Sequence, residues 1–392
     1  MRHSLSKPDW SQIHQKRGHG VLSLPLALFS LLYGAGVRLR LRAFKRGIFK
    51  RSALPGFVVS IGNITTGGTG KTPAVAMLAR WAQTEGRRVA VLSRGYGGRH
   101  RGEVFEVSDG NLINGGPSLS GDEPYLLACE LSGVPVIVSK KRHRAGIFAY
   151  EKFGSDFFIL DDGFQHLGLE RDLDLALVDS DNPFGNGHLL PLGPLREPLS
   201  QLARADAFFL TRFSVSKDAG PNASFSGPAT LALLKEKFPS IPVFRADHLP
   251  DKVVFPLLGS LHEPRFLRKR RVVAFAGIGH PEHFKKTLVE LGANVVRFVG
   301  FGDHHQFKYE EIQDLIRMKD RMGAEYILTT EKDWMRIAPL APSHTDIAYL
   351  RIKFSLLPGQ DEFFNMIEKG LLKKWSPDPT APQSATNGKS GT

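Results

Sequence analysis

The chain has 392 residues, of which 42% are apolar, and its 52 Lys and Arg against 39 Asp and Glu give a formal net charge of +13. This length and apolar content allow two globular domains with sizeable cores, and the single cysteine, Cys129, excludes an internal disulfide and fits a reducing compartment. The positive charge indicates an anionic partner such as nucleic acid, a phosphorylated small molecule or an acidic membrane.

Residues 21–37 form a charge-free, largely apolar run, and a block of Lys and Arg follows it between positions 38 and 51. A helix of this run would be roughly 25 Å long, slightly short for a membrane span. We therefore predict that it inserts into one leaflet, with the basic block against anionic lipids of the cytoplasmic face. A secretory signal and a buried helix of a soluble domain are the alternatives.

The strongest signal is the segment 58–76, which reads VVSIGNITTGGTGKTPAVA. An apolar run leads into a glycine-rich loop, and a helical pattern begins at Lys71. Glycines let successive backbone N–H groups converge on a phosphate, and the N-terminus of a helix adds positive potential. The strict G-x-x-x-x-G-K-[ST] spacing requires glycine where Thr65 stands. The strand before the loop and the helix after it still favour a nucleotide-phosphate site over a glycine-rich turn.

The residues predicted to bind ATP are Thr65, Thr66, Gly67, Gly68, Thr69, Gly70, Lys71 and Thr72. In such a loop the lysine reaches the transferred phosphate and the threonine hydroxyl binds Mg²⁺. We therefore predict these roles for Lys71 and Thr72.

Two further predicted strands, residues 88–93 and 134–139, end in polar loops. The first leads to Arg94 and Tyr96, and the second to a basic loop that contains Arg142. Ligands bind at the carboxyl ends of strands in open α/β sheets, so both arginines are candidates for phosphate contacts, with solvated loop arginines as the alternative. Between these strands lies the GDEP segment, where spacing alone favours Asp122 as an ordinary helix N-cap.

Residues 156–163, DFFILDDG, form an apolar strand that ends in two aspartates. This is the form of a Walker B element, whose carboxylate supports Mg²⁺. We predict Asp161 and Asp162 as magnesium ligands, with Gln165 orienting substrate or capping the turn. The glycine- and proline-rich loop 182–198 contributes Arg196 and Glu197, and long irregular loops of this kind are usually functional.

The second half repeats an α/β pattern with weaker signals. Gly277 and Gly279 complete no dinucleotide fingerprint, and the histidines at 280, 283, 304 and 305 lack the cysteines or the H-E-x-x-H pattern of a zinc site. The predicted parts are a membrane-associating segment (1–51), a P-loop kinase core (52–213), a linker (214–240), a smaller α/β domain (241–375) and a disordered tail (376–392). The predicted fold is a P-loop NTPase-like, mostly parallel sheet with helices on both faces.

Taken in order, the motifs GNITTGGTGKTP, SRGYGG, GDEP, KKRHRAG, LDDGFQH, GNGHLLPLGPLREP, GIGHPEHF, GDHHQF and TTEKDW resemble those of the tetraacyldisaccharide 4'-kinase family of Gram-negative bacteria. The resemblance covers nearly the whole chain. It implies transfer of the ATP γ-phosphate to the 4'-hydroxyl of a membrane-embedded acylated disaccharide 1-phosphate, giving lipid IV-A in lipid A biosynthesis, with ATP and Mg²⁺ as cofactors.

The resemblance also changes the role expected of Asp122, because it implies that this aspartate is the base for the 4'-hydroxyl, assisted by His304. Glu197 becomes a third candidate carboxylate for Mg²⁺, and Arg94, Tyr96, Arg142, Gln165 and Arg196 become candidates for phosphate or substrate contacts. We expect a monomer that binds anionic inner-membrane lipids and no nucleic acid.

Two other classes compete with this interpretation. A membrane-attached regulatory ATPase of the deviant Walker A kind shares GGTGKT, but it carries a lysine before the paired glycines where this chain has Thr66. A nucleic-acid-binding P-loop protein would fit the net charge. Residues alone indicate a Mg²⁺-ATP-dependent P-loop enzyme, and the acceptor comes from the resemblance.

Overall fold

The computed structural model describes residues 23–213, 227–303, 305–343 and 345–375. In these residues thirteen strands form one continuous sheet. Its first half is the core sheet, made of β1 (Phe57–Gly62), β2 (Val89–Ser93), β3 (Phe105–Ser108), β4 (Val136–Val138), β5 (Phe157–Asp161), β6 (Leu173–Asp179) and β7 (Ala207–Thr211). The order across this half is β7-β6-β1-β5-β2-β4-β3, and all pairs are parallel except β3 with β4. The phosphate loop therefore leaves a central strand, β1.

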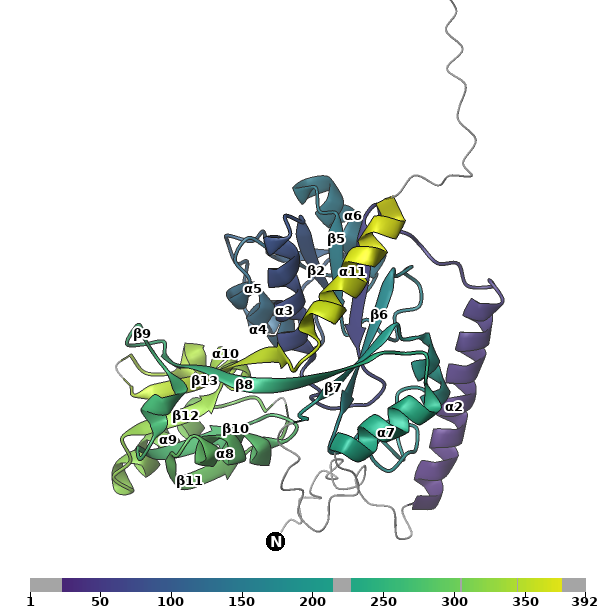
Figure 1. The fold of residues 1–392 in the computed structure, drawn as a ribbon. Coiled ribbons are helices and arrows are strands. Elements are labelled where there is room, and N and C mark those ends of the chain that lie inside the picture. The colour runs from purple at the N-terminus through teal and green to yellow at the C-terminus, as the bar shows by residue number, and fades with distance from the viewer. Residues whose placement is uncertain (1–22, 214–226, 304, 344, 376–392) are drawn as a thin grey trace, which may run out of the picture.

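The second half of the sheet comprises β8 (Val243–Phe255), β9 (Ser260–His262), β10 (Arg271–Ala276), β11 (Asn294–Gly300), β12 (Tyr326–Thr330) and β13 (Ile347–Leu356). Strands β10 to β13 pair in parallel in the order β11-β10-β12-β13. The start of β8 pairs with β7, and the rest of β8 pairs antiparallel with β13. These two long strands therefore connect the halves (Figure 1).

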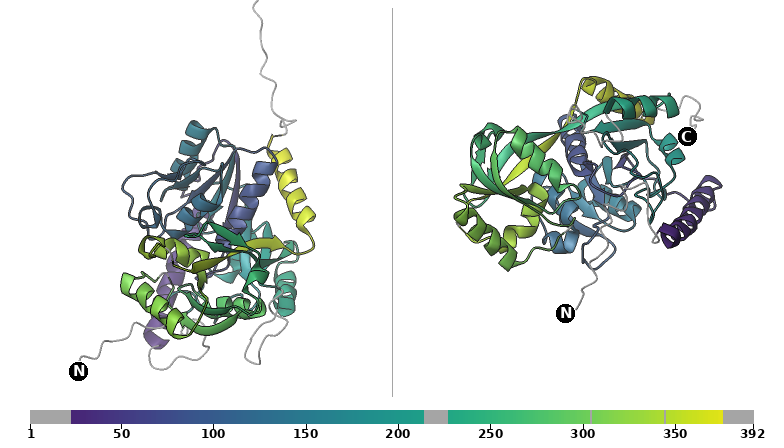
Figure 2. Two further views of the ribbon diagram at one scale, coloured as in Figure 1. Left: turned by 90° about the vertical axis from the view of Figure 1, so that its left-hand side faces the viewer. Right: turned by 90° about the horizontal axis from the view of Figure 1, so that it is seen from below.

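Helices cover both faces of each half (Figures 1 and 2), and the central strands of the core sheet, β1, β2, β5 and β6, are buried throughout. On the core sheet, α3 (Lys71–Thr84) and α5 (Asp122–Glu130) pack on one face and α6 (Arg142–Phe153) on the other, with the short α4 (Pro117–Ser120) before α5. The second half is covered by α8 (Pro281–Glu290) on one face and by α9 (Tyr309–Arg321) and α10 (Glu331–Ile337) on the other. Three short 3₁₀ helices lie among the described residues, namely η1 (Leu199–Arg204), η3 (Pro264–Leu267) and η4 (Ala338–Leu340).

The predicted fold class is confirmed, and two helices bear on the predicted division of the chain. Part of the predicted linker 214–240 is helix α7 (Gly227–Lys237), which packs on the core sheet through Leu234. The C-terminal helix α11 (Gln360–Trp375) returns from the second half and buries Phe363, Ile367 and Leu371 in the core of the first. The chain thus passes from the first half to the second through β8 and returns to the first half at α11.

Helix α2 (Ser23–Lys45) runs beyond the predicted apolar run and includes the first basic residues. Its large apolar side chains Leu24, Leu28, Leu31, Leu32 and Leu39 are exposed. Residues Leu24–Lys45 are long and apolar enough to cross a membrane by length and composition, a test that signal sequences also pass. Figure 1 shows α2 along the side of the core, away from the second half.

Candidate active site

The phosphate loop, residues 63–70, joins β1 to α3 and is held together from within. Asn63 is buried, and its side-chain amide donates to Thr69 Oγ1 at 3.0 Å, while Lys71 Nζ donates to Asn63 Oδ1 at 3.3 Å. A Cβ atom added to Gly67 or Gly68 would meet nothing within 4 Å. The backbone of these two glycines therefore borders open space, which a phosphate group needs for close approach.

Gly70 ends the loop in a left-handed conformation, with φ of 84°. The ring of His248, from β8, lies against it, and an added Cβ would stand 1.8 Å from His248 Nε2. Burial lowers the pKa of His248 to about 4, so this imidazole is neutral. The strand that connects the two halves thus contacts the phosphate loop directly, a contact that sequence reasoning missed because the two residues are far apart in the chain.

We expect Gly70→Ala to destabilise the protein by about 1–3 kcal/mol, because the added methyl group combines an unfavourable φ with a clash against His248. Thermal unfolding measures this effect. Gly68→Ala, where the added atom meets open space, is the matched control for stability. Combining Gly70→Ala with His248→Ala should restore part of the loss, and an unchanged unfolding midpoint in Gly70→Ala would contradict the explanation.

The two aspartates at the end of β5 face the phosphate loop and differ in their electrostatics. Asp162 lies 3.5 Å from Lys71 Nζ and 2.8 Å from Arg196 Nη1. Burial alone would raise its pKa, but these two cations outweigh burial and lower it to about 2. Asp161 is buried and accepts from Ser93 Oγ at 3.0 Å. Burial and the neighbouring carboxylates Glu123 and Asp162 raise the pKa of Asp161 to about 7.

These residues fit a Mg²⁺ ion that is completed by nucleotide phosphates. Asp161 Oδ1 is buried without a hydrogen-bond partner among the described residues, which leaves a carboxylate oxygen for a cation. Within the same part of the chain, no three His, Cys, Asp or Glu side chains cluster as a metal cage. Mg²⁺ in phosphoryl-transfer sites uses one or two carboxylates and a hydroxyl beside substrate phosphates, and Thr72 at the start of α3 supplies the hydroxyl.

Three of the predicted substrate-contact residues lie beside the phosphate loop and the paired aspartates. Gln165 donates through Nε2 to Asn63 O at 2.9 Å, and Arg196 bonds both Asp162 and Gln165. Arg142 is buried at the start of α6 and donates to Asp161 O at 3.3 Å. Its burial lowers the pKa to about 10, yet the guanidinium remains charged at neutral pH. A buried cation beside two aspartates is suited to binding phosphate.

Arg94 and Tyr96 lie farther out. Both line the cavity, but Tyr96 is 80% exposed, and Arg94 is also exposed. Glu197 also lines the cavity, and it is buried with its Oε2 accepting from Arg204 Nη2 at 2.7 Å. Its other oxygen, Oε1, has no hydrogen-bond partner among the residues described. The ion pair with Arg204 thus occupies one of the two oxygens of this carboxylate.

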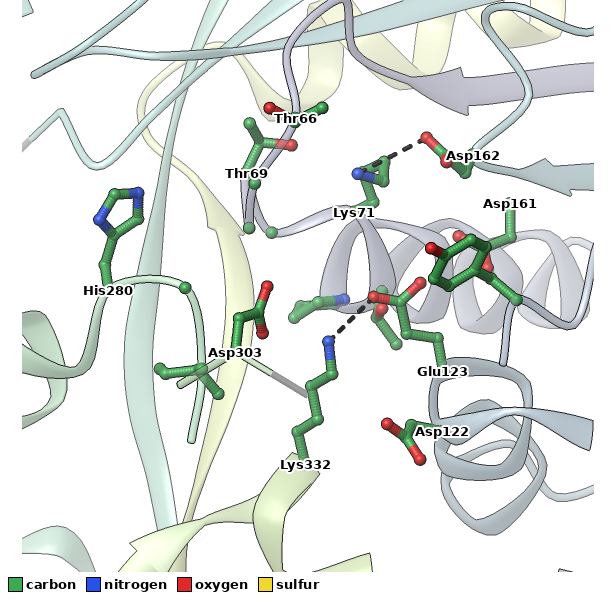
Figure 3. Close-up of a pocket in the computed structure, with 18 of the residues that line it drawn as sticks. Thr66, Thr69, Lys71, Asp122, Glu123, Asp161, Asp162, His280, Asp303 and Lys332 are labelled. Atoms are coloured by element: carbon green, nitrogen blue, oxygen red, sulfur yellow. Dashed lines mark hydrogen bonds and ion pairs between the residues drawn. The ribbon is translucent and has the colours of Figure 1, made fainter. Parts of the chain in front are cut away.

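Asp122 opens α5 and is held by the second half of the molecule. Its Oδ2 accepts from Arg336 Nε at 2.7 Å, and the neighbouring Glu123 pairs with Lys332 Nζ at 3.2 Å. Figure 3 shows both carboxylates pointing into the space below Lys71, with Lys332 approaching from the opposite side. His304 lies outside the described residues. Burial alone would raise the pKa of Glu123, but the nearby cations Lys332 and Lys71 outweigh burial and lower it, and this carboxylate is a site residue that sequence reasoning missed.

These groups share one cavity of about 990 Å³, lined by both halves of the sheet and by α2. Helix α2 contributes Tyr33, Val37 and Arg40, and Arg40 donates to Gln165 O at 2.9 Å. On the other side, the loop after β10 comes close to the phosphate loop, since a Cβ on Gly279 would stand 3.7 Å from Gly68 N. The cavity therefore extends from the phosphate loop to the exposed apolar helix.

Comparisons with known proteins agree over most of this chain. The family model described as tetraacyldisaccharide-1-P 4'-kinase matches residues 22–372. The tetraacyldisaccharide 4'-kinase of Syntrophus aciditrophicus is 41% identical over 362 residues, which are 91% of this chain and 96% of that protein. The corresponding protein of Geobacter sulfurreducens is 40% identical over 84% of this chain and 90% of its own length.

A solved structure is similar in fold as well as in sequence. The crystal structure of LpxK from Aquifex aeolicus in complex with ATP superimposes with a TM-score of 0.69 and 32% identity, covering 90% of this chain and 100% of that one. With a family model over most of its length and relatives of about 40% identity, the chain belongs to the tetraacyldisaccharide-1-P 4'-kinase family.

Proposed function

We propose that this chain transfers the γ-phosphate of ATP to the 4'-hydroxyl of tetraacyldisaccharide 1-phosphate, forming lipid IV-A in lipid A biosynthesis. The observation that carries the proposal is the single cavity in which a phosphate loop, paired aspartates and Asp122 face one another beside an exposed apolar helix. A soluble acceptor would need no such helix at the mouth of the site.

The triphosphate of ATP binds to the backbone N–H groups of residues 65–70 and to Lys71. Thr72 and Asp161 would hold Mg²⁺, with Asp162 and Glu197 as further carboxylates at the site. Bound Mg²⁺ supplies positive charge to the phosphate oxygens in the transition state. Phosphoryl transfer depends mainly on position and charge neutralisation, and the cationic side chains of Arg94, Arg142 and Arg196 contribute to both.

The acceptor reacts from the opposite side of the cavity. Oxygen O4' forms the new bond to the γ-phosphorus, the bond from that phosphorus to the bridging oxygen of ADP breaks, and the hydroxyl proton passes to Asp122. His304 assists the departure of this proton, and Tyr96 and Gln165 orient the sugar. Because Asp122 belongs to the core and His304 to the second half, reaction requires the two halves to close on the substrates.

The membrane supplies the acceptor, so α2 docks the enzyme, as a monomer, on the cytoplasmic face of the inner membrane. Beside α2 a groove of about 500 Å³ is lined by Arg38, Arg42, Lys45, Arg51 and Arg204. Of these, only Arg204 has a carboxylate partner in the described residues. The other four are exposed, and they bind anionic phospholipid headgroups while the leucines of α2 enter the acyl region.

Labelled phosphate transfer tests the proposed function directly. Wild-type protein, γ-labelled ATP, Mg²⁺ and detergent-solubilised tetraacyldisaccharide 1-phosphate should yield labelled bisphosphorylated lipid. If the protein binds ATP and hydrolyses it without labelling lipid, the regulatory ATPase interpretation is correct instead. Steeply salt-dependent binding to DNA or RNA that survives neutralisation of the basic block would support the nucleic-acid interpretation.

We expect the combined substitution of Leu28, Leu31 and Leu32 by glutamine to lower kcat/KM for vesicle-presented acceptor at least about tenfold, because the exposed apolar face no longer enters the bilayer. The affinity for ATP should stay within about twofold, because these side chains lie outside the cavity. A short-chain, water-soluble acceptor is the control substrate and should react at the wild-type rate. Equal losses of ATP affinity and lipid phosphorylation would contradict the docking role.

A further inference from the structure

Helix α10 presents two cations to the start of α5 across the boundary between the halves. Lys332 and Arg336 are four residues apart and therefore share one face of the helix. Lys332 Nζ lies 3.2 Å from Glu123 Oε1, and Arg336 Nη2 lies 2.7 Å from Asp122 Oδ2. The proposed base is thus contacted by a charged side chain from the other half of the molecule.

The far side of Arg336 is held by residues of the second half. Its Nη1 donates to Gly277 O at 3.0 Å and to Asp333 Oδ1 at 3.0 Å. Asp333 in turn accepts from Gly277 N at 2.9 Å and from Thr330 Oγ1 at 2.7 Å. The side chain of Arg336 is 5% exposed and that of Asp333 is fully buried.

This network fixes the direction of the guanidinium before it meets Asp122. A planar guanidinium with five donors can bind a carboxylate and a second set of acceptors at once, which a lysine ammonium cannot reproduce. Nε and Nη2 both approach the same oxygen, Oδ2, of Asp122. Because this double contact fixes the position of Oδ2, it also fixes the rotation of the carboxylate. The direction in which the other oxygen, Oδ1, points is then fixed as well.

We infer that Arg336 is a positioning residue for Asp122, supplied by the second half, which orients the base for the 4'-hydroxyl. The inference rests on the proposed function, in which Asp122 accepts the proton of the acceptor. It gives the TTEKDW and GIGH motifs a common task, since Thr330, Asp333 and Gly277 hold the arginine. A general base must lie within hydrogen-bond reach of its proton, so loss of orientation lowers kcat.

The alternative role for Arg336 is a strut that holds the halves together without acting on the reaction. A strut would affect stability and ATP binding along with the rate, and its effect would be independent of whether residue 122 can act as a base. Residues that act as a unit show strongly non-additive effects, so a double-mutant cycle separates the two roles.

The cycle compares the full-length wild type with Asp122→Asn, Arg336→Gln and the double variant, measuring kcat and KM for ATP with saturating acceptor. We expect Asp122→Asn to lower kcat by about 10²–10⁴-fold and Arg336→Gln by about 10–100-fold, with KM for ATP within about twofold. The double variant should be no slower than Asp122→Asn within about threefold. Arg336→Lys, which keeps the charge without the planar fork, should recover only part of the rate.

Arg351→Gln is the matched control, because Arg351 pairs with Glu331 in the same half at 3.1 Å and does not line the cavity. The unfolding midpoint of Arg351→Gln measures how much stability the protein loses when a comparable ion pair is removed. The kcat of this variant should remain near that of the wild type. If Arg351→Gln and Arg336→Gln slow the reaction equally, Arg336 is a strut and the inference is wrong.

The cycle also separates failure of the inference from failure of the proposed function. If the separate effects of Asp122→Asn and Arg336→Gln multiply in the double variant, Arg336 does not act through Asp122, while the base assignment stands. If Asp122→Asn retains the wild-type kcat, the base assignment itself fails and the inference falls with it.

Discussion

Replacing Lys71 with alanine should lower kcat for phosphate transfer by about 10³-fold or more. The Nζ atom of Lys71 lies 3.3 Å from Asn63 Oδ1 and 3.5 Å from Asp162 Oδ1, and the side chain is only 9% exposed. The ammonium group is therefore held at the loop in a poorly solvated place, where a fixed charge stabilises a phosphoryl-transfer transition state strongly. Single-turnover transfer from γ-labelled ATP measures the effect.

Two controls keep this result interpretable. Arg80→Ala removes a cation from the same helix α3, but Arg80 is exposed and pairs with Glu130, so its kcat should stay near the wild-type value. Thermal unfolding of Lys71→Ala checks that the protein remains folded although, among the described residues, Asp162 then has Arg196 as its one ion-pair partner. A folded Lys71→Ala variant that loses less than about tenfold in kcat would exclude this lysine from the phosphate site.

Replacing Asp122 with asparagine should lower kcat by about 10²–10⁴-fold while the KM for ATP changes little, because general base catalysis contributes a factor of this size. Asparagine preserves the shape of the side chain, and its amide oxygen can still accept from Arg336. It cannot take up the proton of the 4'-hydroxyl. Comparing lipid labelling with ATP affinity separates the loss of a base from the loss of nucleotide binding.

The control for Asp122→Asn is Asp314→Asn, which neutralises an exposed carboxylate on α9 that pairs with Arg317. Its kcat should match the wild type, and equal losses in the two variants would point to a non-specific effect of net charge. If Asp122→Asn raised the KM for ATP as strongly as it lowered kcat, Asp122 would belong to the nucleotide site and another group would be the base.

The strands and the phosphate loop were predictable because their signals are local. Residues 57–62 form an apolar run that could be recognised as β1 and that is buried throughout. The strand predicted to end in two aspartates is β5, which ends at the first of them, Asp161. Gly70 occupies a left-handed conformation that disfavours other residues, which is why a glycine precedes Lys71. Such features depend on a residue and its neighbours in the chain.

Several other site features could not be predicted in this way. Asp122 resembled an ordinary helix cap, and nothing near it in the chain indicated a partner 214 positions later. Arg142 was expected in a cationic loop, yet it is buried at the start of α6 beside Asp161. Helix α2 was expected to end near residue 37, but it continues to Lys45, because its basic residues face solvent and line grooves without interrupting the helix.

The sequence by itself determined the type of sheet, the phosphate loop, the paired aspartates and, through its ordered motifs, the family and its acceptor. Only the tertiary structure decided which charges meet, bringing Glu123 near Lys71, His248 against Gly70 and Arg336 onto Asp122. The physical reason is the separation along the chain of the residues that interact. Strand and turn formation follow from contacts between neighbouring residues, whereas ion pairs and ring contacts depend on how β8, β13 and α10 place the second half against the core.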